Sequence, residues 1–267
     1  MALVEVNAVS KSYPRRTGLR TEWRPVVEGI SLKIDVGETL GLVGESGSGK
    51  TTVARMILGL VAPTSGAILV DGVDVACASG AQMRRLRRQM QPVFQDPYAA
   101  LNPRMNVLEI VTEPLVIHKR EAGMDTRRGA LRAKALELLR SVGLDESALA
   151  RYPHEFSGGQ RQRINIARAL ALQPRMLVLD EPVSALDVSV GAQIVNLLKT
   201  LQRAHGLTYL FISHSMPLVR YLATRIAVME RGRMVETGEA GELCAHPRQA
   251  YTRQLLAATP ELPVITG

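Results

Sequence analysis

The residues best suited to chemistry form a glycine-rich stretch near residue 44. Small residues at this spacing let successive backbone N–H groups point inward at phosphate oxygens, and a following helix adds the positive end of its dipole. The Lys50 ammonium can reach β- and γ-phosphates, and the Thr51 hydroxyl can bind Mg²⁺. The alternative is a structural turn with an incidental lysine, but a predicted strand and helix flank the motif. We therefore expect nucleotide phosphates to bind Gly44, Glu45, Ser46, Gly47, Ser48, Gly49, Lys50, Thr51 and Thr52.

Further polar residues follow apolar runs later in the chain. The run 176–179 ends in Asp180 and Glu181, His214 follows another run, and Gln95 follows Val93-Phe94. Ligands of open α/β sheets bind where strands end in this way. Each residue alone would more often be structural. Their order downstream of the glycine-rich loop indicates that they belong to one functional site.

A second glycine-rich element is Phe156-Ser157-Gly158-Gly159-Gln160, which precedes a helical run. Alone it fits a capped helix beginning at Ser157 as well as it fits a ligand site. Downstream of Glu181, the segment 184–187 reads Ser-Ala-Leu-Asp and ends in Asp187.

Hydrophobic patterning predicts the strands and helices that carry these residues. Continuous apolar runs at 39–43, 176–179, 207–212 and 226–229 predict parallel strands buried on both faces. Helix periodicity predicts one helix that buries Val53, Met56, Ile57 and Leu60, and another with Ile194, Leu197, Leu198 and Leu201 on one stripe. This alternation predicts an α/β sandwich around a mainly parallel sheet.

The middle of the chain has a different pattern. From about residue 98 to 171 we expect helices at 106–117, 128–142 and 159–171 and no strand, which indicates a helical insertion. After about residue 238 we expect a short helical tail.

Composition restricts the class of protein further. The 267 residues include 33 Lys+Arg and 25 Asp+Glu, a net charge of +8, and 46% are hydrophobic. This balance favours anionic partners. Only Cys77 and Cys244 are present, so no disulfide framework is expected. No apolar run approaches the ~20 residues of a membrane span, and we expect no secretory signal. The basic run 84–88 lacks interleaved aromatics, which favours a solvated face over nucleic-acid binding.

Together these motifs resemble the nucleotide-binding subunit of an ATP-binding cassette (ABC) transporter, over essentially the whole chain. The segment 94–104, Phe-Gln-Asp-Pro-Tyr-Ala-Ala-Leu-Asn-Pro-Arg, and the tail 246–252, His-Pro-Arg-Gln-Ala-Tyr-Thr, resemble the dipeptide, oligopeptide and nickel import branch, particularly its second ATPase subunit. Two positions depart from the family pattern. Phe156 stands where leucine is commonest, and Ser215 follows the histidine where aspartate is usual. With two cysteines, the chain lacks the iron–sulfur cluster of some branch members.

The resemblance implies a fold and its boundaries. It implies a P-loop NTPase sandwich of the ABC ATPase type, with an antiparallel β subdomain and an inserted α-helical subdomain. Residues 1–97 and 172–238 would form the nucleotide-binding core, and 98–171 the helical insertion that carries the signature Phe156–Gln160. Residues 239–267 would form a helical tail of the oligopeptide-transporter type.

The resemblance also implies roles for ATP and Mg²⁺ chemistry. Glu181 would polarise the attacking water, and His214 would contact the γ-phosphate, while Lys50 neutralises phosphate charge. The metal shell would comprise Thr51, Gln95 and, through water, Asp180, and Tyr13 would stack on adenine. Facing a partner subunit's nucleotide would be Ser157, Gly158, Gly159, Gln160 and Asp187.

The implied assembly is a head-to-tail dimer with a second ATP-binding subunit, identical or homologous, at the cytoplasmic face of a bacterial inner membrane. Two permease subunits would bind through the helical insertion, and a periplasmic binding protein would deliver a peptide or nickel-type chelate. One alternative is a non-transport ABC ATPase in a phosphonate-degrading or nucleic-acid repair complex, which segments 94–104 and 246–252 disfavour. The other is a plain P-loop GTPase or kinase, which Phe156–Gln160 and the absence of an Asn-Lys-x-Asp motif disfavour.

Overall fold

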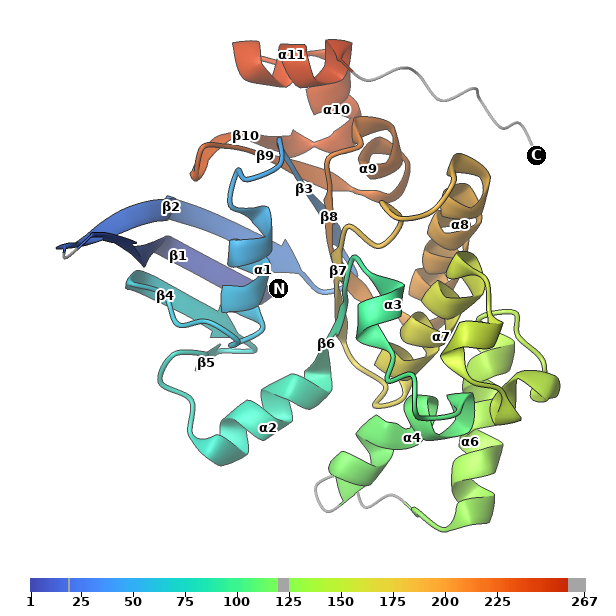
Figure 1. Cartoon of the computed structure of the whole chain (residues 1–267). Helices are drawn as coiled ribbons and strands as arrows, with labels where there is room; N and C mark the ends of the chain where they lie inside the picture. Colours follow the sequence, from blue (N-terminus) through green and yellow to red (C-terminus); the bar gives the residue numbers. More distant parts are fainter. Residues whose placement is uncertain (19, 120–124, 259–267) are drawn as a thin grey trace. The chain divides into compact units, whose positions relative to one another are not determined.

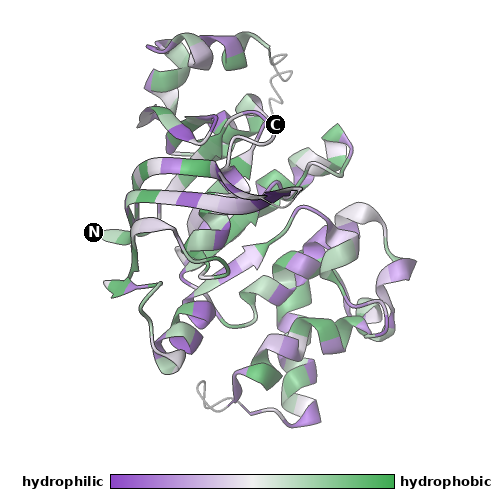
Figure 2. Ribbon diagram, turned by 60° about the vertical axis from the view of Figure 1, so that its left-hand side comes forward, coloured by the Kyte–Doolittle hydropathy of each residue, from purple (hydrophilic) through white to green (hydrophobic). Residues whose placement is uncertain are grey.

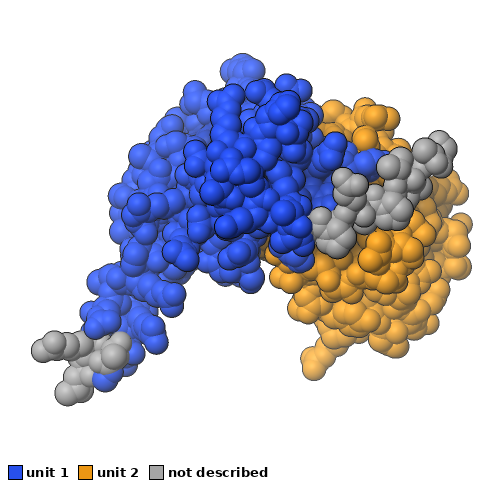
Figure 3. Space-filling model, turned by 90° about the horizontal axis from the view of Figure 1, so that it is seen from above, with its two compact units in different colours: residues 1–83, 208–267 blue, residues 84–207 orange. Residues whose placement is uncertain are grey.

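The computed structural model describes residues 1–18, 20–119 and 125–258 (Figure 1). It divides into two compact units, coloured separately in Figure 3: unit 1 comprises Met1–Met83 and Thr208–Gly267, and unit 2 comprises Arg84–Leu207. Residues 120–124 of the expected insertion and 259–267 of the expected tail lie outside the described residues.

Unit 1 contains an antiparallel sheet with the strand order β2-β1-β4-β5. Val4 and Val6 are buried while Glu5 between them is not, as expected for a strand with one face on the core. The antiparallel part implied by the resemblance is therefore present. Its strands are β1 (Ala2–Thr17), β2 (Arg20–Asp35), β4 (Ser65–Val70) and β5 (Val73–Asp74).

Unit 1 also contains four strands in the order β10-β9-β3-β8, in which β3 runs parallel to both β8 and β9. Every residue of β3 and β8 is buried, which explains why apolar residues dominate both strands. The parallel strands predicted from these runs are confirmed. The strands are β3 (Thr39–Val43), β8 (Thr208–Ser213), β9 (Arg225–Glu230) and β10 (Arg233–Glu239).

The helices of unit 1 cover these strands. Val53, Met56 and Ile57 of α1 are buried as predicted, but the prediction was wrong for Leu60, which is 52% exposed. The helix ends at Ile57, and Gly59 then turns the chain with a left-handed φ of 64°. The described helices are α1 (Lys50–Ile57), α9 (Met216–Leu222), α10 (Ala240–Ala245) and α11 (Ala250–Ala257).

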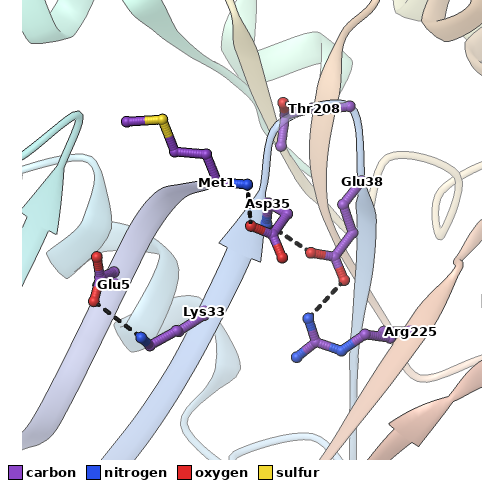
Figure 4. A network of polar contacts seen from close by, with 8 residues as sticks. Met1, Glu5, Lys33, Asp35, Glu38, Thr208 and Arg225 are labelled. Atoms are coloured by element: carbon purple, nitrogen blue, oxygen red, sulfur yellow. Dashed lines mark hydrogen bonds and ion pairs between the residues drawn. The ribbon is translucent and has the colours of Figure 1, made fainter.

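A polar cluster joins the strands at the beginning of β3 (Figure 4). The nearly buried Glu38 carboxylate accepts the Asp35 N–H at 2.7 Å and pairs with the Arg225 guanidinium at 2.9 Å. The Gly37 N–H donates to the Thr208 hydroxyl at 2.9 Å. The pair is part-buried, and such a pair fixes geometry more firmly than a fully exposed one. This cluster therefore fixes the position of the first residues of β3. Strand β3 leads into the glycine-rich loop.

Unit 2 consists of the parallel pair β6–β7 and helices. The helices predicted at 106–117, 128–142 and 159–171 are confirmed to within about one residue. Hydrophilic and hydrophobic residues are mixed along these helices in Figure 2. Helix α8 buries Ile194, Leu198 and Leu201 as predicted, whereas Leu197, predicted on the same stripe, is only half-buried. The elements are β6 (Met90–Val93), α3 (Pro97–Ala100), α4 (Val107–Ile117), α6 (Arg128–Ser141), η1 (Glu146–Ala150), η2 (Pro153–Glu155), α7 (Gly158–Leu170), β7 (Met176–Asp180) and α8 (Val188–His205).

Helix α2 (Gly80–Gln89) spans the sequence boundary between the units. Across residues 1–18, 20–119 and 125–258, no helix combines the length and apolar character needed to cross a membrane.

Candidate nucleotide site

The glycine-rich loop connects β3 to α1 in a backbone conformation that requires glycine. Gly44, Gly47 and Gly49 have φ values of 152°, 80° and 104°. A Cβ on Gly44 would lie 2.1 Å from the Met229 carbonyl oxygen, and one on Gly49 would lie 2.8 Å from the Val26 carbonyl oxygen. The loop therefore approaches neighbouring backbone too closely for a side chain at either position.

The Lys50 side chain folds back into this loop. Its ammonium donates to the carbonyl oxygens of Gly44 and Glu45, both at 2.8 Å, and to the Ser48 hydroxyl at 3.3 Å. Only 4% of Lys50 is exposed. Charge-assisted bonds to an anion are stronger than bonds to neutral oxygens, so a phosphate entering the loop would be a favourable partner for this ammonium. Lys50 and Thr51 also begin α1, whose N-terminus favours negative charge.

Tyr13 and His214 are the other predicted site residues of unit 1. Tyr13 lies on β1, with the Lys11 ammonium 5.2 Å from its ring centroid. His214 is exposed directly after β8. The Ser213 hydroxyl accepts the Ser215 N–H at 3.0 Å, so the residue that replaces the usual aspartate contributes its backbone to this turn.

The two adjacent carboxylates of unit 2 occupy different environments. Asp180 is the last residue of β7 and only 7% exposed, whereas Glu181 is half-buried. Glu181 has a φ of 49°, a left-handed conformation rare outside glycine. Ser184 donates its N–H at 3.2 Å and its hydroxyl at 3.1 Å to the Glu181 carbonyl, and these bonds hold the turn. Strain of this kind costs about 1–3 kcal/mol and clusters at functional sites.

The second glycine-rich element begins α7 with a complete capping box. The Ser157 hydroxyl accepts the Gln160 N–H at 3.3 Å, and the Gln160 side chain accepts the Ser157 N–H at 3.1 Å. A Cβ on Gly159 would lie 2.4 Å from the Val190 side chain, and one on Gly158 would lie 3.1 Å from Leu186. The helix start predicted at Ser157 is thus confirmed, with its glycines packed against the segment 186–190.

Asp187 caps the next helix, α8. Its carboxylate accepts the Val190 N–H and the Ser189 hydroxyl, both at 2.8 Å, and these two bonds lower the pKa of Asp187. The carboxylate therefore remains ionised at the positive end of the helix dipole.

Sequence reasoning missed residues that hold the segment after Gln95. Gln95 itself is exposed. The Arg161 guanidinium lies 3.7 Å from the Tyr98 ring centroid, and Arg168 donates to the Ala100 carbonyl at 2.6 Å. The two arginines stand seven residues apart on α7, hence on one helix face, and this spacing was the available signal. The signature helix therefore anchors the segment that carries the predicted Mg²⁺ ligand.

The predicted donor set comprises the Thr51 hydroxyl, the Gln95 amide oxygen and, through water, the Asp180 carboxylate, and it is all-oxygen, as Mg²⁺ prefers. The described residues contain no cluster of three or more His, Cys, Asp or Glu able to hold a metal. A site with a single carboxylate is compatible with that finding, because Mg²⁺ is commonly bound by one or two carboxylates together with substrate phosphates.

A glycine-rich loop that closes on its own lysine, between a buried parallel strand and a helix, defines a P-loop nucleotide-binding protein. The sequence profile of the ABC transporter family matches residues 27–184. The chain belongs to the ABC transporter family.

Relatives and solved structures agree. A protein of Brucella ovis named as a peptide import ATP-binding protein is 49% identical, over 97% of this chain and 78% of that protein. The oligopeptide transport ATP-binding protein OppF of Streptococcus mutans is 47% identical, over 97% and 82%. A dimeric ATP-binding cassette in a post-hydrolysis state with ADP and phosphate is 31% identical, with a TM-score of 0.77 over 89% of this chain and 98% of that chain. The similarity to this solved structure confirms the ABC ATPase fold.

Proposed function

We propose that this chain is the ATP-hydrolysing subunit of a membrane importer whose cargo is a peptide. The observation that carries the proposal is the loop 44–51, closed around the buried Lys50 ammonium. The names of the peptide import and oligopeptide transport relatives support the cargo class. A nickel-type chelate is the other cargo that the branch resemblance allows.

The roles of the residues in this proposal are those that the family resemblance implies. Phosphoryl transfer to water depends mainly on positioning and on neutralising charge. Lys50 and the loop amides 44–52 bind the phosphates, and Tyr13 stacks on adenine. Thr51, Gln95 and, through water, Asp180 would hold Mg²⁺, which would supply positive charge to neutralise the phosphate oxygens. Glu181 orients the attacking water, and His214 contacts the γ-phosphate.

The partner subunit completes the site in this proposal. The N-terminus of α7, with Ser157, Gly158, Gly159 and Gln160, binds the γ-phosphate held by a second ATP-binding subunit, and Asp187 borders the same interface. Dimeric cassette structures that resemble this chain support a dimer, and the head-to-tail arrangement is part of this proposal. The second subunit is either identical to this chain or homologous to it.

The same assembly has a location and further partners. Residues 1–97 and 172–238 act as the nucleotide-binding core, 98–171 as the helical insertion and 239–267 as the tail. Two permease subunits bind the insertion at the cytoplasmic face of the inner membrane, and a periplasmic binding protein delivers cargo. The exposed hydrophobic side chains Tyr98 (62%) and Ile117 (66%) on α3 and α4 suit such a surface.

Two neighbouring substitutions test the assignment of the carboxylates. Glu181→Gln keeps size but removes the charge that polarises water, so turnover in the assembled transporter should fall ~10²-fold or more. ATP binding should survive, and an ATP-bound dimer should accumulate on size exclusion with MgATP. Asp180→Asn should instead weaken Mg²⁺-dependent binding and trap no dimer. Near wild-type phosphate release by Glu181→Gln would overturn the assignment.

A further inference from the structure

The C-terminal helix α11 is fixed to unit 1 through a carboxylate on β10. The two oxygens of Glu236 accept the backbone N–H groups of Arg248 at 2.9 Å and Gln249 at 3.1 Å. These donors stand at the beginning of α11, where a helix has unpaired N–H groups and favours negative charge. Thr252, in the first turn of α11, is fully buried. The helix is therefore docked at its N-terminal end.

This docking places Tyr251 against the phosphate loop. The Glu45 N–H donates to the Tyr251 hydroxyl at 3.1 Å, across 206 residues of sequence. Burial raises the pKa of Tyr251, and the Glu45 and Glu230 carboxylates act in the same direction. The hydrogen bond from the Glu45 N–H and the charge of Arg231 oppose this rise without cancelling it. The hydroxyl thus stays neutral and keeps its hydrogen-bonding capacity throughout the physiological range.

The backbone N–H and the backbone carbonyl of Glu45 are bound by different groups. Its N–H is bound by Tyr251, and its carbonyl accepts the Lys50 ammonium at 2.8 Å. When Lys50 turns to phosphate oxygens, as the proposed function requires, the bond to the Glu45 carbonyl is lost. The Tyr251 bond does not involve Lys50 and remains available. Glu45, the second residue of the loop, would then be held by the C-terminal helix.

We propose that Tyr251 is a positioning residue for ATP binding, through which the C-terminal helix holds the phosphate loop in its binding conformation while Lys50 engages the phosphates. Tyr251 acts through the Glu45 peptide. The inference rests on the proposed nucleotide-binding function of the loop, and it assigns to the C-terminal segment a part in that function.

The test is a titration of the full chain with MgATP and MgADP, using wild type, Tyr251→Phe and Tyr221→Phe. Phenylalanine keeps the ring and removes only the hydroxyl, and loss of one neutral hydrogen bond should raise Kd about three- to tenfold. Tyr221, half-exposed on α9, is the matched hydroxyl-removal control and should leave Kd within about twofold. The melting temperature of nucleotide-free Tyr251→Phe should match wild type, because Lys50 still binds the loop in that state. Glu236→Gln should shift Kd in the same direction by a smaller factor, because it weakens the attachment of α11.

A second readout follows the bond itself. Hydrogen exchange at the Glu45 amide, measured with saturating MgADP, should be faster in Tyr251→Phe than in wild type and unchanged in Tyr221→Phe. Equal nucleotide affinity and equal Glu45 exchange in wild type and Tyr251→Phe would overturn this inference alone. If the wild-type chain bound no nucleotide, the proposed function would fail, and this inference with it.

Discussion

Two glycine-rich helix starts, the loop 44–51 before α1 and the element 157–160 before α7, differ in how their glycines are used. In the first, Gly44 and Gly49 lie against backbone carbonyls with positive φ, and Lys50 closes the loop. In the second, Gly158 and Gly159 meet only side chains, and the Ser157–Gln160 box satisfies the end of the helix locally.

The difference supports the proposal that the loop is a self-contained phosphate site, whereas the element 157–160 acts on a partner's nucleotide. The loop surrounds its own cation and can enclose a phosphate within one chain. The start of α7 carries no lysine and presents a helix N-terminus, which is a site for an anion supplied from elsewhere. This agrees with the proposal that one chain binds ATP and another completes the site.

The largest expected effect that separates the two elements comes from Ser157→Arg. A guanidinium would fill the space proposed for the partner's γ-phosphate, so hydrolysis by the assembled transporter should fall about 10²-fold or more. Ser157→Ala is the matched control, since it removes the cap at a cost of ~1 kcal/mol of stability and leaves the space free. A phosphate-release assay of both variants in the full assembly checks this. If Ser157→Ala inactivated as strongly as Ser157→Arg, the capping role alone would explain the loss.

Among substitutions that add one methyl group to the loop, Gly44→Ala should weaken MgATP binding most. The new Cβ would meet the Met229 carbonyl oxygen, which is backbone and cannot turn away, so MgATP binding should weaken more than tenfold. Gly47→Ala is the comparison, because no atom lies within 4 Å of its Cβ position. Its only expected cost is the ~1–2 kcal/mol of strain that a side chain brings to a left-handed backbone conformation. Equal binding by the two variants would show that the close approach at Gly44 has no role.

Gly159→Ala should destabilise the chain by a different mechanism that can be reversed. Its Cβ would overlap the Val190 side chain, an overpacking expected to cost ~1–3 kcal/mol of unfolding free energy. Because the obstacle is a side chain, Val190→Ala should restore much of the loss, giving a coupling of about 0.5–3 kcal/mol in a double-mutant cycle. Gly129→Ala, in α6 with nothing near its Cβ, should not destabilise. Additive losses in urea unfolding would contradict the packing argument.

The smallest expected effect concerns pH and the attachment of α11. Partial burial opposes ionisation of Glu236, but the nearby Thr252 hydroxyl, the N–H groups of Arg248 and Gln249 and the Arg248 charge together lower its pKa. A lowered pKa means that the stabilisation is complete above the unfolded value of about 4.3 and is lost as pH falls through the folded value. Hydrogen exchange of residues 250–257, corrected for intrinsic rates, should lose protection in that acidic range.

Glu236→Gln should remove this pH dependence, and Glu239→Gln at the end of the same strand should retain it. If protection of α11 in wild type did not change as pH falls below about 4, the carboxylate would not be its anchor.

The sequence predicted elements wherever burial was two-sided or helix periodicity was strong. Strand β3 was placed residue for residue, because all five of its residues are buried. The long strands β1 and β2 escaped residue-level prediction, since Pro14, Arg15 and Arg24 interrupt their alternation. The helix behind the loop was extended too far because Leu60 fits its period, whereas Gly59 ends it.

The candidate site shows the same division. The loop residues were predictable because adjacent positions do the chemistry together. The Arg161–Tyr98 and Tyr251–Glu45 contacts join positions 63 and 206 residues apart, so no local pattern contained them. The strained backbone at Glu181 also depends on the tertiary turn and has no sequence signal of its own.

We propose that this chain binds ATP in its own loop and uses its signature element on a second subunit's nucleotide. One MgATP titration of the isolated chain in three forms, wild type, Lys50→Ala and Ser157→Arg, tests both parts of this proposal. We predict that Lys50→Ala loses binding by more than about tenfold, because the buried ammonium is the main charge in the loop. We predict that Ser157→Arg binds within about twofold of wild type, because its site belongs to the partner. Loss of MgATP binding in Ser157→Arg, or intact binding in Lys50→Ala, would show that the two elements do not divide these roles.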